Sequence, residues 1–227
     1  MNRRMIAPVI IGLLGVSVLL WLANWQMQRL TWKEAMLAEI EARIQAAPVP
    51  LPVQVDPKGD KYLPVKMSGI SGPVGVGAPE ITVLVSRKDY GAGYRVITPF
   101  LTDGRTVLLD RGFIRLEQKT EPRPPVSLTV TGNLHWPDDR NSSTPANDIA
   151  AGIWFARDIA DMARALGTEP ILVIARSETG QGVRAMPVGI TGIANNHLNY
   201  AITWFLFAVA WLGMTGFWLW RIRQRLD

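Results

Sequence analysis

His197 is the side chain in this sequence best suited to binding a metal ion. The protein has only two histidines, and neutral imidazole is a common protein ligand for haem iron. Three tryptophans follow His197 at intervals of seven residues, which places them near one face of an α-helix: Trp204, Trp211 and Trp218. Tyr200 and Trp204 offer flat apolar walls for a macrocycle. The alternative is an interfacial histidine that binds lipid headgroups, and the sequence leaves both interpretations open.

Two apolar runs must position this histidine. They cover residues 5–23 and 201–220, and neither contains a charged residue. Each is long enough to cross a hydrocarbon core of about 30 Å at a rise of about 1.5 Å per residue. The first run exceeds the roughly 7–15 apolar residues of a signal peptide, so we expect it to be an anchor. Its Gly12 and Gly15 suit close helix approach.

Basic residues set the expected orientation of these two spans. Arg3 and Arg4 precede the first span, whereas Arg221, Arg223 and Arg225 follow the second. Because positive charge favours the cytoplasmic side, we predict cytoplasmic termini and a periplasmic central domain at a bacterial inner membrane. The formal net charge of +5 is concentrated at these ends. That distribution indicates a membrane protein and argues against a nucleic-acid partner.

The fold class follows from these runs and from the stretch between them. We predict a membrane α+β protein, with two transmembrane helices around a mostly antiparallel β domain that carries one short helix. Expected segments are a transmembrane helix over 1–25, a stalk helix over 26–47, a periplasmic β-rich domain over 48–194, a second transmembrane helix over 195–221 and a basic tail over 222–227.

Alternating apolar residues and turn signals predict the elements of the central domain. Expected strands cover residues 62–68, 81–86, 94–101, 105–111, 126–134, 153–156 and 171–175. Asp103-Gly104 predicts a tight hairpin turn, and Asp158 predicts the start of a short helix that ends at Gly167. Pro99, which has no N–H to donate, predicts a sheet edge or a bulge. A small barrel or a curled sheet with one covering helix is therefore expected.

The sequence gives little support to an enzyme. It contains no cysteine, which excludes disulfides, thiolate catalysis and iron–sulfur clusters. We find no nucleophile-elbow, P-loop or zinc-protease motif. His135 is expected to be an exposed loop residue, and no copper or zinc site is expected. A membrane-anchored enzyme is kept as a third alternative, after the two non-enzymatic hypotheses described below.

Four blocks resemble the surfeit locus protein 1 family of cytochrome c oxidase assembly factors. They are LANWQMQRLTWKEAML at 22–37, GAGYRVITPFLTDGRTVLLDRGFI at 91–114, WFARDIADMARALG at 154–167 and NNHLNYAITWFLFA at 195–208. The last block is the most specific. Two positions depart from the family pattern: Ala23 stands where glycine is common, and Asp110 stands where asparagine often precedes the Arg-Gly pair.

The resemblance implies a role in inserting haem a into subunit I of haem–copper oxidase. It implies transient haem binding by the histidine that opens the second span, here His197. Subunit I is the implied partner, with haem a synthase as a second candidate. From the same blocks we take five candidate partner contacts: Trp25, Gln26, Arg29, Arg111 and Gly112. Arg111 is expected to be exposed at a strand end, where it is either a partner contact or part of a structural strand terminus, and Gly112 is expected to permit a bulge. The second hypothesis is a protein-only scaffold that stabilises subunit I without binding haem.

Overall fold

The computed structural model describes residues 3–72, 80–149 and 152–225, which form two compact units. The boundaries fall after Glu39 and after Gly189, so that a pair of long helices forms one unit and a β-rich domain forms the other. The predicted fold class, two apolar helices that flank a mostly β domain with one short helix, is confirmed.

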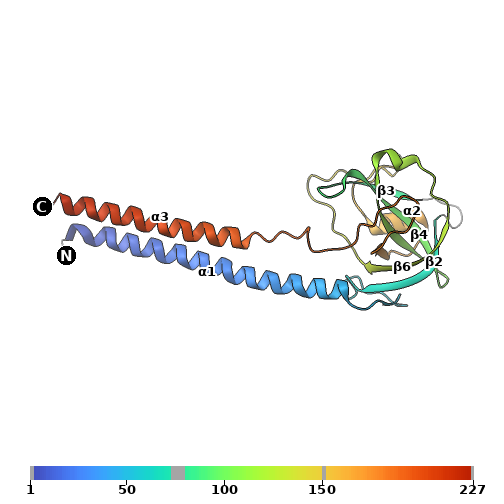
Figure 1. Cartoon of the computed structure of the whole chain (residues 1–227), viewed down its shortest axis with the longest axis horizontal. Coiled ribbons are helices and arrows are strands. Elements are labelled where there is room, and N and C mark those ends of the chain that lie inside the picture. The colour runs from blue at the N-terminus through green and yellow to red at the C-terminus, as the bar shows by residue number, and fades with distance from the viewer. Residues whose placement is uncertain (1–2, 73–79, 150–151, 226–227) are drawn as a thin grey trace. The chain divides into compact units, whose positions relative to one another are not determined.

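The helix pair consists of α1 (Arg3–Gln45) and α3 (His197–Gln224). The two helices run side by side in opposite directions, so that the start of α1 and the end of α3 lie at the same end of the pair (Figure 1). Both helices are long and apolar enough to cross a membrane. Most of their large apolar side chains are exposed, as a surface that faces lipid requires. α1 is continuous through residues 26–45, so no break separates its apolar part from the expected stalk.

Small residues allow α1 and α3 to approach closely. A Cβ built on Gly12 would lie 2.4 Å from Cγ2 of Thr215, and one built on Gly15 would lie 2.3 Å from the Trp211 ring. Ala201 is buried at the same interface. The Trp211 indole also donates from Nε1 to the Gly12 carbonyl oxygen at 3.1 Å. This bond satisfies a polar group that hydrocarbon would leave unpaired.

In the described part of the β domain, seven strands form a sheet that closes into a small barrel. Their bounds are β1 (Val49–Pro50), β2 (Pro64–Ser71), β3 (Ile81–Arg87), β4 (Gly91–Thr102), β5 (Arg105–Arg115), β6 (Val126–Leu134) and β7 (Leu172–Ala175). The strand order is β1-β2-β6-β7-β5-β4-β3, and an additional β2–β4 pairing closes the ring. Only the β1–β2 and β5–β7 pairings are parallel among these strands.

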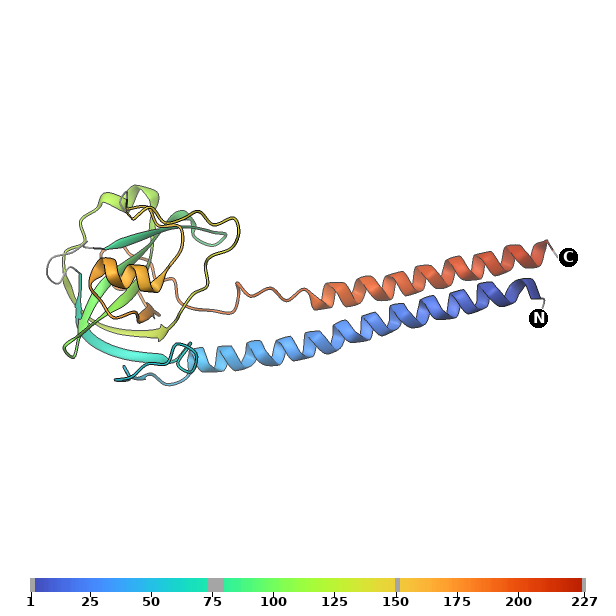
Figure 2. The same cartoon turned by 180° about the vertical axis from the view of Figure 1, so that it is seen from behind.

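Two apolar clusters occupy opposite faces of the sheet. Side chains alternate along β5, so that Val107 and Leu109 belong to one cluster and Leu108 to the other. The second cluster also contains Met162 of helix α2 (Ile159–Leu166). Figure 2 shows α2 packed against the strands. The predicted single covering helix is therefore present, and Gly167 ends it in the left-handed conformation at φ +66°.

The hairpin and its proline behave as the sequence indicates. Asp103 and Gly104 connect β4 and β5 with φ of +46° and +75°, the conformation that a type I′ turn needs. Pro99 lies where β4 changes its neighbour, because β3 pairs with β4 as far as Ile97 and β2 pairs from Phe100. A residue without an N–H fits this gap between two partner strands.

Three local expectations are corrected. Residues 153–156 form isolated bridges in place of a strand, including one between Trp154 and Val83. The short strand β1 was not among the predicted elements. Asp158 precedes α2 but its side chain makes no cap hydrogen bond, since the carboxylate instead binds Arg140 and Asn147. A short 3₁₀ helix (Leu116–Thr120) also follows β5.

Candidate functional site

His197 is the first residue of α3 and is bonded across the helix pair. Its Nδ1 lies 2.8 Å from Oε1 of Gln26 on α1. An amide oxygen can only accept a hydrogen bond, so the imidazole donates from Nδ1 and the lone pair resides on Nε2. Nε2 has no hydrogen-bonding partner among the residues that the structure describes. The ring is therefore held in the tautomer that can ligate a metal through Nε2.

This arrangement suits a ligand that needs only one protein donor. No group of three or more His, Cys, Asp or Glu side chains that could hold a bare metal ion occurs in the described part of the chain. Haem supplies its own pyrrole nitrogens, so one imidazole from the protein would suffice to hold it. An acceptor such as Gln26 fixes the orientation and the tautomer of the ring. The donor chemistry at His197 thus fits haem.

Gln26 takes a different place from the one expected. Its side chain is 9% exposed and is already bonded to His197. This amide meets His197 and not solvent, and the expected partner contact at Gln26 stays a prediction. No local pattern indicates this pairing, because the two residues are 171 positions apart.

The aromatic residues after His197 divide between the helix interface and the outer surface. Trp204 is half-buried, and its ring packs edge-on against Phe207 with centroids 5.9 Å apart. Tyr200 is 56% exposed, one turn from His197. Trp211 reaches the interface, whereas Trp218 is exposed. Tyr200, Trp204 and Phe207 therefore form an apolar aromatic surface beside the histidine.

Trp25 and Arg29 lie on the exposed surface of α1. The guanidinium carbon of Arg29 lies 4.5 Å from the centroid of the Trp32 ring, a cation–π contact. These residues are free to meet another molecule, in contrast to Gln26 between them.

Arg111 and Gly112 form a bulge in the barrel. The register of the β4–β5 pair shifts between Val96 and Ile97, which face Gly112 and Asp110 and leave Arg111 unpaired. Gly112 has φ +123°, so the expected bulge is confirmed. It lies within β5, however, and not at the strand end.

The expected exposure of Arg111 is wrong. The residue is 1% exposed, because a loop folds over it. Its guanidinium donates from Nε to Thr179 Oγ1 at 3.0 Å, from Nη1 to Gln181 Oε1 at 2.8 Å and from Nη2 to the Thr179 carbonyl at 3.1 Å. Arg111 therefore fixes the loop around Thr179 and presents no surface to a partner.

A buried ionic cluster beside the bulge was missed by the sequence analysis. Asp110 is fully buried; it pairs with Arg95, lies 3.5 Å from Arg157 and accepts a hydrogen bond from the Gly112 amide at 3.1 Å. Arg157 also binds Asp139 at 2.7 Å. The signal that could have found it is a carboxylate inside the apolar strand VLLDRGF, since a buried charge needs a partner.

Burial and mutual attraction set the charges of this cluster. Burial lowers the pKa of the Arg95 guanidinium, and the attraction of Asp110 opposes that effect. Burial raises the pKa of Asp139, but its hydrogen bonds and attraction to Arg157 outweigh burial and hold the pKa below its usual value. The cluster links three segments of the domain by paired charges, which indicates a structural role.

His135 is not the exposed loop residue that the sequence predicts. Its ring stacks on Tyr62 with centroids 5.3 Å apart, and its Nδ1 is buried with no hydrogen bond to the described residues. Burial and then the charge of Arg157 lower its pKa to about 4. The side chain is therefore neutral at pH 7 and belongs to the packing of the domain.

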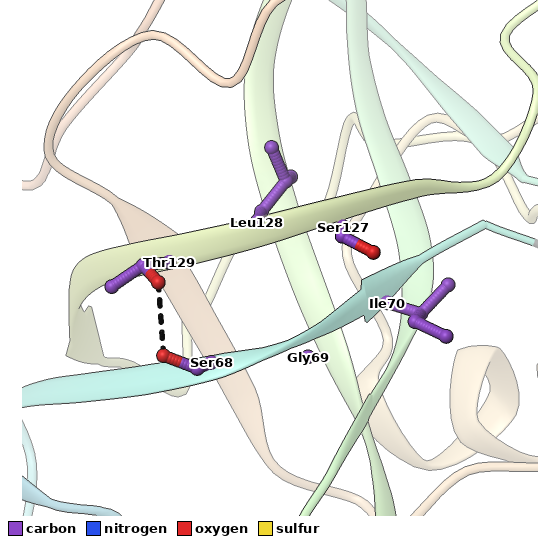
Figure 3. A pocket seen from close by; sticks show the side chains of 6 residues that line it. All are labelled: Ser68, Gly69, Ile70, Ser127, Leu128 and Thr129. Atoms are coloured by element: carbon purple, nitrogen blue, oxygen red, sulfur yellow. Dashed lines mark hydrogen bonds between the residues drawn. The ribbon is translucent and has the colours of Figure 1, made fainter.

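A shallow hollow of about 440 Å³ lies between β2 and β6 (Figure 3). Ser68 and Thr129 bond to each other across it at 2.9 Å, so their hydroxyls are already paired. The remaining lining residues are Gly69, Ile70, Ser127 and Leu128. Its lining contains no ionisable side chain, and we assign no ligand to it.

The fold and the site define a class of protein with two units: a pair of helices able to span a membrane and joined by a histidine–glutamine bond, and a small β barrel encoded between them. The SURF1 family model matches residues 13–209. The chain belongs to the SURF1 family.

Curated relatives carry the same family name. The chain is 32% identical over 212 residues to surfeit locus protein 1 of Xenopus tropicalis, a match that covers 81% of this chain and 66% of that protein. It is 32% identical over 215 residues to the Homo sapiens surfeit locus protein 1, covering 83% of this chain and 70% of that one. The SURF1-like protein of Drosophila melanogaster is 29% identical over 211 residues, with coverage of 83% and 70%. The chain thus spans about two thirds of the length of these relatives.

Proposed function

We propose that this protein is an assembly factor for haem–copper cytochrome c oxidase that holds haem a at His197 before its insertion into subunit I. Family membership supports the assembly role, as the resemblance of its sequence blocks implies. The observation that supports the haem step is the bond between His197 Nδ1 and Gln26 Oε1, which leaves the lone pair of the imidazole on Nε2.

Each residue at the site has a defined part in this proposal. Gln26 orients the imidazole and fixes its tautomer. His197 provides the single bond to the ligand from Nε2, and Tyr200 and Trp204 provide flat apolar contacts. When bound, haem a would supply the iron that accepts the Nε2 lone pair. Because His197 would be the single protein ligand, the site would suit temporary holding and release, and no catalytic step is assigned.

The proposal includes an orientation of the protein in the bacterial inner membrane. The helices would cross the inner membrane with both termini in the cytoplasm, as the flanking arginines indicate. The β domain would then be periplasmic. Exposed Trp25 and Arg29, which flank buried Gln26 on α1, are the proposed contacts for subunit I or for haem a synthase.

A second function is favoured by the same hydrogen bond. A histidine that bonds to glutamine across two antiparallel helices also ties those helices together, which is all that a protein-only scaffold for subunit I would need. The two functions differ in one respect, namely whether Nε2 carries a ligand.

Substitutions at Gln26 separate the two functions. We expect Gln26→Leu to weaken haem binding about 10- to 100-fold, because removal of a second-shell partner has that effect on metal affinity. Gln26→Glu keeps an oxygen acceptor and should bind nearly as well as wild type. Gln28→Leu is the matched control, since this glutamine is exposed and points elsewhere on α1. Haem titration of the purified protein, followed by the Soret band, gives the affinities. Equal affinities for Gln26→Leu and Gln28→Leu would show that the bond to Gln26 does not prepare His197 for haem, and the absence of a Soret band from titrated wild-type protein would favour the scaffold.

A further inference from the structure

We propose that an apolar groove beside Trp211 holds the isoprenoid tail of the haem whose iron is bound at His197. This inference rests on the proposed function, and it assigns a second contact site within the helix pair. The tail is the hydroxyethylfarnesyl chain that distinguishes haem a and haem o from haem b.

The groove lies between the two helices and is apolar throughout. Five residues of α1 and one of α3 line a volume of about 440 Å³: Ile11, Leu14, Gly15, Val18, Leu19 and Trp211. This volume is within the range of about 300–1,000 Å³ that small-molecule sites occupy. The polar atom of Trp211 is already bonded to the Gly12 carbonyl. The groove therefore offers a ligand dispersion contacts only, which selects an apolar chain.

Aromatic side chains lead from the histidine to the groove. At 3.6 residues per turn, His197 and the next four residues of this series lie within an arc of about 80° on α3: Tyr200, Trp204, Phe207 and Trp211. Tyr200 and Phe207 are both more than half exposed. Trp211, at the far end of the series, is the residue that α3 contributes to the groove. A ligand bound at His197 can thus follow one continuous apolar surface into the groove.

The length of this path matches the length of the tail. Gln26 marks the level of His197 on α1, and the groove extends on the same helix from Leu19 to Ile11. At about 1.5 Å per residue, these residues lie roughly 10 Å and 22 Å along the axis from Gln26. Three isoprene units joined by single bonds of about 1.5 Å extend roughly 15 Å. A tail that starts at the rim of the macrocycle therefore ends inside the groove.

Haem o and haem b test the inference, because both present an iron and two propionates and only haem o carries the tail. The purified wild-type protein is titrated with each haem in the same detergent, and the Soret band gives the ratio of dissociation constants. We expect haem o to bind about tenfold more tightly than haem b, because packing a chain of this length adds many dispersion contacts. Val18→Trp should fill the groove and bring the ratio close to one, with haem b affinity unchanged.

Val209→Trp is the matched control, since this valine is exposed on α3 and does not line the groove. It should leave the ratio at its wild-type value. If the wild-type protein binds both haems with equal affinity, or if the two tryptophan substitutions change the ratio equally, the groove does not hold the tail. Haem binding at His197 would still stand. Failure to bind either haem would overturn the groove together with the proposed function.

Discussion

Gly112 should resist replacement, because both its backbone conformation and its surroundings disfavour a side chain. Its φ of +123° lies in a region that other residues rarely adopt, and this conformation alone costs a side chain roughly 1–3 kcal/mol. A Cβ at this position would also lie 2.1 Å from the carbonyl oxygen of Arg184. That oxygen is backbone and accepts the Phe113 amide at 2.7 Å, while the Arg184 amide donates to Phe113 at 2.9 Å.

Relief of this clash must therefore move a paired segment. Loss of the two hydrogen bonds adds about 1 kcal/mol each, so Gly112→Ala should lower the free energy of unfolding by roughly 3–5 kcal/mol. Small domains have a total stability of about 5–15 kcal/mol. If the wild-type protein lies near the lower end, at about 5 kcal/mol, this loss would leave little of the variant folded.

Gly104→Ala separates the backbone penalty from the close contact as causes of the destabilisation. Gly104 also has a positive φ of +75°, but no atom lies within 4 Å of a Cβ built there. It should cost only the backbone penalty of about 1–2 kcal/mol. Urea unfolding of the purified protein in detergent, followed by tryptophan fluorescence, measures both variants. If Gly112→Ala is no more destabilising than Gly104→Ala, the close contact with Arg184 does not constrain the bulge and the reasoning is refuted.

Three further predictions follow from buried groups and from charge. Arg111→Ala should lower the free energy of unfolding by at least about 2 kcal/mol, since it leaves buried oxygens of Thr179 without a donor; the exposed Arg87→Ala is the control, and equal unfolding midpoints for the two would contradict the burial. The pKa of His135 is lowered from 6.5 to about 4. Its contribution to the free energy of unfolding is therefore fully present above pH 6.5 and is lost progressively as the pH falls to 4. This contribution amounts to up to about 3 kcal/mol. His135→Phe should flatten that part of the stability–pH curve, and an unchanged slope between pH 6.5 and 4 would show that His135 is not held neutral. Periplasmic reporter fusions near Gly91 should be active and fusions after Asp227 inactive, and activity at the C-terminus would overturn the orientation.

The sequence predicts those features whose cause is local. Apolar runs specify α1 and α3, the positive φ available to Asp103-Gly104 specifies the hairpin, and Gly167 specifies the end of α2. The heptad spacing predicts that Trp204, Trp211 and Trp218 share one face of α3, but it does not predict that Trp211 reaches the interface while Trp218 is exposed.

The features that sequence reasoning missed depend on distant contacts. The bond between His197 and Gln26 requires the register of two helices, which neither helix encodes by itself. Arg111 is buried because residues 179–182 fold over it, and a charge within a strand gives no indication of a loop 68 residues away. His135 appeared exposed in a polar stretch, although Tyr62 supplies the surface that covers it.

The absorption spectrum of protein purified from cells that make haem a tests the central claim most directly. We predict a Soret band for wild type and for His135→Ala, which removes the only other histidine. His197→Ala should lose the band while it remains in the membrane, because the apolar residues 201–220 are unchanged. Tyr200→Ala and Trp204→Ala should reduce it less, since they remove walls and not the bond to iron. A His197→Ala protein that keeps an unchanged Soret band would contradict ligation by this histidine and would favour the protein-only scaffold.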